Sequence, residues 1–134
     1  MSVRPDVWAQ LVCAGAGGFC GAVARFTVTV GMKKLVPGFP LGTMFVNLLG
    51  CLLMGAVMGA TQESRSLSPP VRSFLTIGLL GSFTTFATFS QEGYQLIRER
   101  SHGSALIYVV GSVVLGLLLF LVGSELAIRF SQRS

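Results

Sequence analysis

The chain has 134 residues, of which 51% are hydrophobic and only 11% are charged, and its mean hydropathy is +0.72. These values are typical of integral membrane proteins, exclude an ordinary soluble domain and leave no length for a separate one. Ten Lys and Arg residues against five Asp and Glu residues give a net charge of +5. Because the basic residues lie at segment ends and form no patch, they favour lipid head groups or a small anion over nucleic acid.

Four hydrophobic segments with short connections predict an all-α membrane protein in which residues 1–134 form a single four-helix transmembrane domain. The first segment spans about residues 7–32. It lacks a small-residue cleavage site followed by a polar region, so we do not interpret it as a signal peptide and expect it to remain in the protein. Gly17 and Gly21 form a small-xxx-small pair that lets another helix approach closely. Arg25 follows one turn later, and it either snorkels to the interface or faces an aqueous vestibule.

A basic turn with two prolines, residues 33–40, leads to the second segment, residues 41–61. Thr43 and Asn47 are four residues apart in this segment, so they lie on one helix face. An Asn deep in a membrane helix is costly without a partner, and two interpretations stay open. Its side chain either joins two helices through a hydrogen bond, or its NH2 group, with two donors, faces a polar path.

The third segment, residues 71–98, contains the most informative stretch of the chain, GLLGSFTTFATFS at positions 78–90. Hydroxyl side chains lie there among three phenylalanines, namely Ser82, Thr84, Thr85, Thr88 and Ser90 among Phe83, Phe86 and Phe89. In hydrocarbon, polar groups must find partners inside the protein, and irregular backbone survives only where protein buries it or a cavity adjoins it. The stretch therefore predicts a broken helix along a polar, aromatic path, with core packing as the alternative for the phenylalanines.

The fourth segment spans about residues 104–128 and is strongly hydrophobic. Tyr108, Ser112 and Gly116 follow one another at intervals of four, so they share one helix face. Two interpretations of this thin polar stripe stay open. It either packs small residues against a neighbouring helix, with the tyrosine hydroxyl bonded locally, or it contributes to the polar path.

The distribution of basic residues predicts no preferred orientation in the membrane. The side of the two termini carries five basic residues, Arg4, Arg65, Arg72, Arg129 and Arg133. The opposite side carries four or five, Lys33, Lys34, Arg98 and Arg100, with Arg25 if it snorkels there. Because the two counts are nearly equal, the positive-inside rule predicts almost no preferred orientation. We therefore expect the chain to insert both ways and to pair as an antiparallel, dual-topology homodimer.

Three blocks of the sequence resemble the signature blocks of the Fluc fluoride channel family, also called CrcB. They are GGFCGAVARF at 17–26, FPLGTMFVNLLGCLLMG at 39–55 and GLLGSFTTFATFSQE at 78–92, and the match spans all four segments. The resemblance implies a fluoride-selective channel in the bacterial inner (plasma) membrane that exports fluoride passively and lowers its cytoplasmic level. It also implies an antiparallel homodimer with two pores and a structural Na+ buried on the dimer axis.

The resemblance assigns pathway roles position by position. Asn47 falls on a pore-lining face with Thr43 one turn before it, and the rings that line the ion's route correspond to Phe86 and Phe89. Other polar positions near the pathway correspond to Thr85, Thr88, Tyr108 and Ser112.

The resemblance also implies vestibule and cation positions. Arg25 and Glu92 match charged positions near the vestibules, and the backbone carbonyls that hold Na+ correspond to Gly81 and Thr84. The chain departs from the family pattern at Ala87, where Ser is more frequent, and at Ser82, where a second Gly is frequent.

Two other classes of protein remain open at the level of the sequence. A small multidrug exporter also has four helices, but proton-coupled cation export needs an acid within the membrane, and Glu92 lies near a segment end. A membrane scaffold would use the same glycines and phenylalanines for packing alone. An enzyme has no support, because His102 is the single histidine and no nucleophile or metal cluster surrounds it; Cys13, Cys20 and Cys51 are expected to be small core residues.

Overall fold

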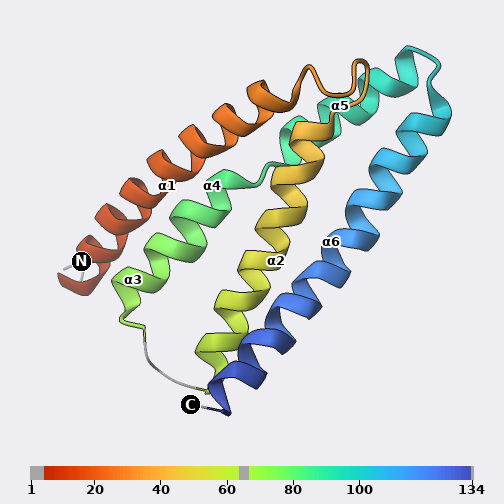
Figure 1. The fold of residues 1–134 in the computed structure, drawn as a ribbon. Coiled ribbons are helices and arrows are strands. Elements are labelled where there is room, and N and C mark those ends of the chain that lie inside the picture. Colours follow the sequence, from red (N-terminus) through yellow and green to blue (C-terminus); the bar gives the residue numbers. More distant parts are fainter. Residues whose placement is uncertain (1–4, 64–66, 134) are drawn as a thin grey trace.

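The computed structural model describes residues 5–63 and 67–133, and within these ranges the chain is helical, with no strand (Figure 1). Helices α1 (Pro5–Met32) and α2 (Leu41–Glu63) form the first two spans, and α6 (His102–Ser131) forms the last. Four stretches of these residues are long and apolar enough to cross a membrane, namely Asp6–Met32, Leu41–Thr61, Pro69–Arg98 and His102–Ser131. The predicted four-span, all-α architecture is confirmed.

The third span is built from four consecutive pieces. They are α3 (Pro69–Ser73), the π-helix η1 (Phe74–Leu80), the short α4 (Gly81–Phe83) and, after two extended residues, α5 (Phe86–Arg98). The predicted break in this span is therefore confirmed. The π-helix was not predicted, because no residue pattern in this stretch distinguishes it from an α-helix.

The break redirects the third span between two neighbours. Before the break, α3, η1 and α4 pack against α1, and after it α5 packs against α6 (Figure 1). The break itself lies beside α2, which contacts both α4 and α5.

Both chain ends lie on the same side of the bundle, and the α1–α2 and α5–α6 connections lie on the other (Figure 1). This agrees with four spans and with the two groups of basic residues counted from the sequence. Arg4 and Arg65, which belong to that count, lie outside the described residues.

Glycines let helix backbones approach one another directly. In α1, Gly17 and Gly21 are buried against the backbone of η1, so the predicted small-xxx-small pair packs as expected. Between α2 and α6, a Cβ on Gly55 would meet the Phe120 carbonyl, and one on Gly123 would meet the Leu52 carbonyl. Because lipid tails are as apolar as these side chains, such close backbone packing is what stabilises helix pairs in a membrane.

We expect Gly123→Ala to destabilise the bundle by about 1–3 kcal/mol, because its Cβ would overlap backbone that cannot move without separating α2 from α6. The matched control is Gly103→Ala on the same helix, where a Cβ would meet nothing within 4 Å. Thermal unfolding of both variants in detergent gives the comparison. Equal unfolding temperatures for the two variants would show that the α2–α6 contact is not closely packed.

Candidate functional site

The break in the third span consists of Thr84 and Thr85, both in extended conformation. Thr84 has φ −84° and ψ 157°, and Thr85 has φ −150° and ψ 119°. The Thr84 N–H and hydroxyl both donate to the Leu80 carbonyl at 3.1 Å, in the last helical turn before the break. Thr85 begins the helix after it, since its hydroxyl accepts the Thr88 N–H at 3.3 Å as an N-cap. Gly81 has helical angles and lies three residues before the break.

Asn47 of α2 pairs with both backbone groups of Thr85. The Thr85 N–H donates to Asn47 Oδ1 at 2.8 Å, and Asn47 Nδ2 donates to the Thr85 carbonyl at 3.1 Å. Two bonds of opposite direction fix the orientation of the amide, because a flipped amide would place oxygen against oxygen. One turn further along α2, the Thr84 methyl group lies directly against Gly50. Asn47 therefore forms an interhelical bond, and the second N–H of its NH2 group has no acceptor among the described residues.

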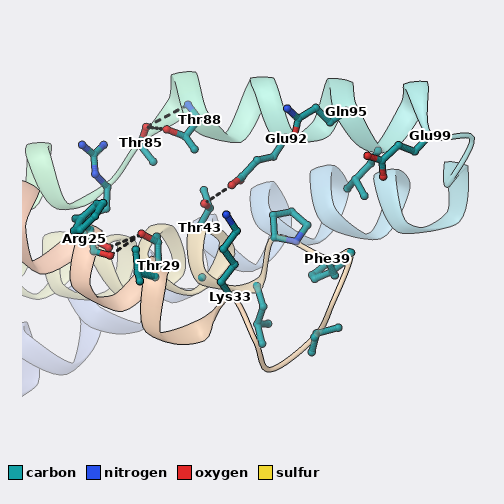
Figure 2. Close-up of a pocket in the computed structure, with 18 residues that line it drawn as sticks. Arg25, Thr29, Lys33, Phe39, Thr43, Thr85, Thr88, Glu92, Gln95 and Glu99 are labelled. Atoms are coloured by element: carbon teal, nitrogen blue, oxygen red, sulfur yellow. Dashed lines mark hydrogen bonds between the residues drawn. The ribbon is translucent and has the colours of Figure 1, made fainter.

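Glu92 accepts hydrogen bonds from two hydroxyl groups. Thr43 Oγ1 donates to Glu92 Oε1 at 2.9 Å, and the Tyr108 hydroxyl donates to Glu92 Oε2 at 2.7 Å (Figure 2 shows the first). Thr43 is 3% exposed and Tyr108 is fully buried. A hydroxyl has only one proton to donate, so both of these donors are committed to the carboxylate. The three residues join α2, α5 and α6.

The aromatic rings form a continuous row. Phe89 is buried between Phe86 and Tyr108, with ring centroids 5.8 Å and 5.1 Å away, and Phe39 meets Tyr108 edge to face at 5.7 Å. Such tilted and edge-on contacts suit the charge distribution of aromatic rings. Phe86 lies at the end of the row and is 80% exposed. In a single chain, Phe89 thus belongs to the core while Phe86 faces outward.

A pocket of about 510 Å³ opens beside this cluster, towards the α1–α2 connection (Figure 2). Two cations, Arg25 and Lys33, and two carboxylates, Glu92 and Glu99, line it together with several threonines. Arg25 is partly buried and lines the pocket, which favours the vestibule interpretation over simple snorkelling. Within residues 5–63 and 67–133, neither of the two cations forms an ion pair.

Two of the remaining predicted pathway residues, Thr88 and Ser112, have hydroxyl donors that no acceptor in the described chain uses. The Thr85 hydroxyl donates to Thr88 Oγ1 at 3.0 Å, which leaves the Thr88 proton available. The Ser112 hydroxyl is buried and has no hydrogen-bond partner among the residues that the structure describes. Together with the second N–H of Asn47, these are three uncommitted neutral donors. Of the three, only the Ser112 hydroxyl is buried, and a buried polar group without a partner is rare in native proteins and calls for a ligand or a functional reason.

Comparison with known proteins shows the family to which this chain is related. Residues 12–124 match the family described as CrcB-like protein, Camphor Resistance (CrcB). The chain belongs to this family. It is 40% identical to the fluoride-specific ion channel FluC of Chlorobium phaeobacteroides (strain BS1), over 92% of this chain and 96% of that one. It is also 40% identical to the FluC of Nitrobacter winogradskyi, over 89% and 95%, and 44% identical to FluC 1 of Moorella thermoacetica, over 83% and 80%.

The CrcB-family resemblance assigns the Gly81 and Thr84 carbonyls to a Na+ site, and their surroundings fit this role. In an uninterrupted α-helix, a carbonyl accepts the N–H four residues later. Here the Thr85 N–H donates to Asn47 and the Thr88 N–H donates to the Thr85 hydroxyl. Both carbonyls thus lack their helical partners, and unwound backbone carbonyls are the groups with which membrane proteins coordinate Na+.

The structure brings most of the predicted site residues of this CrcB-family chain into one region around the break and the pocket. Three participants were not predicted: Gly50, which seats the Thr84 methyl group, Phe39, which extends the aromatic row, and the backbone of Thr85. Of these, Gly50 had a usable signal, since it lies three residues after Asn47 on the same face. The carboxylate of Glu92 was expected at a vestibule, and it both lines the pocket and anchors two hydroxyls.

We expect Tyr108→Phe to lower the free energy of unfolding by about 1.5–3 kcal/mol, because one oxygen of a partly buried carboxylate loses its donor while ring packing is kept. Tyr94→Phe is the matched control, since Tyr94 is 60% exposed and a change at an open site costs at most about 0.5 kcal/mol. Chemical denaturation in detergent measures both. Similar stability of the two variants would show that the Tyr108–Glu92 bond contributes nothing.

Proposed function

We propose that this chain is a fluoride-selective channel that lets fluoride leave the bacterial cell passively through the inner membrane. The observation that carries the proposal is the pair of donors beside the break that no acceptor in the described chain uses, on Asn47 and Thr88. Helix α6 also carries the Ser112 hydroxyl, which is buried and has no partner in the described chain. The curated relatives bear the name of a fluoride-specific ion channel, which is not an enzyme.

The chemistry of these donors suits fluoride. Fluoride is a small, strongly hydrated anion, so it enters an apolar protein only where donors replace its water, and each missing bond to a buried ion is costly. Neutral hydroxyl and amide donors replace water without holding the ion as tightly as a buried lysine would. Conduction needs sites that are good enough to enter and weak enough to leave.

The aromatic rings and the vestibule complete this pathway. The edges of Phe86 and Phe89 carry the positive part of the ring quadrupole and offer weak contacts to an anion. Arg25 and Lys33 raise the local anion concentration at the entrance. Thr43 and Tyr108 act indirectly. Their hydroxyls bind the Glu92 carboxylate and hold this negative charge at the side of the pocket.

The functional unit in this proposal is an antiparallel homodimer with two pores. Phe86 is 80% exposed in the single chain, so a second copy is needed to enclose the path on that side. The even distribution of basic residues gives no preference for one orientation, which suits a pair of opposite copies. Gly81 and Thr84 carbonyls from both copies would then surround one Na+ on the dimer axis.

The two hydrogen bonds that Glu92 accepts also favour a channel over a multidrug exporter. Proton-coupled export needs an acid that is free to exchange protons with its substrate, and both oxygens of Glu92 already accept hydrogen bonds. Purified protein in liposomes distinguishes the classes. A voltage-driven leak selective for fluoride over chloride supports the channel, proton-coupled cation uptake supports the exporter, and silence supports a scaffold.

In the same assay, we expect Ser112→Ala to lower fluoride flux about tenfold, the effect of losing one donor worth about 1.4 kcal/mol at the limiting barrier. Unfolding temperature should stay unchanged, because the hydroxyl bonds no protein group in the described chain. Ser124→Ala, about three turns further along α6, is the control for loss of a serine hydroxyl. Wild-type flux in Ser112→Ala would remove this hydroxyl from the pathway.

Orientation can be tested by adding three lysines at the C-terminus. The added charge should hold that end in the cytoplasm and abolish fluoride export by the altered chain alone, because opposite copies can no longer pair. Co-expression with a chain that carries three added lysines in the α1–α2 connection, on the other side of the bundle, should restore export. Fluoride resistance of cells lacking their own exporter measures the result, and full activity of one locked form alone would contradict the antiparallel dimer.

A further inference from the structure

We propose that Asn47 is a positioning residue for the cation site, in addition to its place beside the fluoride path. The inference rests on the Na+ site of the proposed function. Asn47 Oδ1 accepts the Thr85 N–H, the group that would otherwise close the helix by donating to the Gly81 carbonyl. By this single bond, a side chain on α2 keeps a carbonyl of the third span available to a cation.

The local sequence does not by itself require a break at this point. The stretch GSFTTF at 81–86 has no proline, Gly81 is helical, and neither Thr84 nor Thr85 has a positive φ. Threonine at these positions can also continue a helix. The extended conformation therefore depends on partners from outside the segment.

Those partners lie on one face of α2. Asn47 bonds both backbone groups of Thr85, and Gly50 leaves the space in which the Thr84 methyl group rests. Without the Asn47 amide, the Thr85 N–H and carbonyl would be partly buried without partners, which is unfavourable in a membrane. Rewinding the helix is the nearest way to satisfy the N–H, and it would use the Gly81 carbonyl.

One amide thus serves both ions in the proposed channel. Its Oδ1 and one N–H fix the break, and its second N–H remains for fluoride. Because both bonds to Thr85 orient the amide plane, the same contact that frees the carbonyl also aims the remaining donor. Loss of Asn47 should consequently remove the stabilisation of the protein by Na+. If Asn47 were only a fluoride ligand, its loss would leave that stabilisation unchanged.

The test compares unfolding temperatures of the purified full chain in NaCl and in N-methylglucamine chloride. We expect Na+ to raise the Tm of the wild type and Asn47→Ala to lose this rise. A second variant combines Asn47→Ala with replacement of Thr85 by its α-hydroxy acid, which removes the N–H that would close onto the Gly81 carbonyl, so part of the rise should return. The control makes the same replacement at Ala105 in the Asn47→Ala chain. The Ala105 N–H bonds Ser101 at 2.9 Å in α6, away from the break, so this control should restore nothing.

General destabilisation lowers the Tm in both salts, so only the difference between them reports the cation site. A retained Na+ effect in Asn47→Ala, or in Asn47→Leu of similar volume if Asn47→Ala does not fold, would overturn the inference, and so would no recovery of the effect in the double variant. No Na+ effect in the wild type would overturn both the cation site and the inference, while fluoride flux in liposomes would leave the channel standing. A Na+ effect that depends on Asn47 without fluoride flux would support the inference and reject the channel.

Discussion

A helix that breaks inside a membrane exposes backbone N–H and carbonyl groups for which no water is available, so the protein must supply every partner itself. In this chain the Asn47 amide supplies two of them by pairing with Thr85, and the Thr85 hydroxyl supplies a third by capping α5. The remaining features depend on this arrangement. The third span changes neighbours at the break, and two carbonyls lose their helical partners there.

A carboxylate is unfavourable beside the proposed anion pathway, and the contacts of Glu92 explain how it is accommodated. Hydroxyls from α2 and α6 bind one oxygen each, so the charge is neither unpaired nor directed freely at an entering anion. The same two bonds join three spans around the aromatic row. Polar groups inside a membrane are thus used for helix association as well as for transport, and removing one partner leaves the others unsatisfied.

Close backbone approach makes this polar site possible in a chain of only four spans. Glycines of α1 lie on the backbone of η1, and Gly50 receives the Thr84 methyl group, so the break is pressed between α1 and α2. Helices this near to one another bring an amide on one within hydrogen-bond reach of a peptide group on the next. Larger residues at the same positions would separate the partners by more than a hydrogen bond allows.

Composition, hydrophobic runs and residue spacing were sufficient to predict the four spans, the broken third one and the family, because bilayer thickness and backbone satisfaction restrict what such a sequence can form. The spacing of four also placed Thr43 and Asn47 on one face of their helix. Which donors are committed could not be predicted, since Thr43 finds Glu92 forty-nine positions away and Asn47 finds the backbone of Thr85 thirty-eight positions away. The sequence determined which polar groups are present. The packing of α2 against the third span decided which of them bond one another, because a hydrogen bond depends on ångström distances that spacing along one helix does not specify.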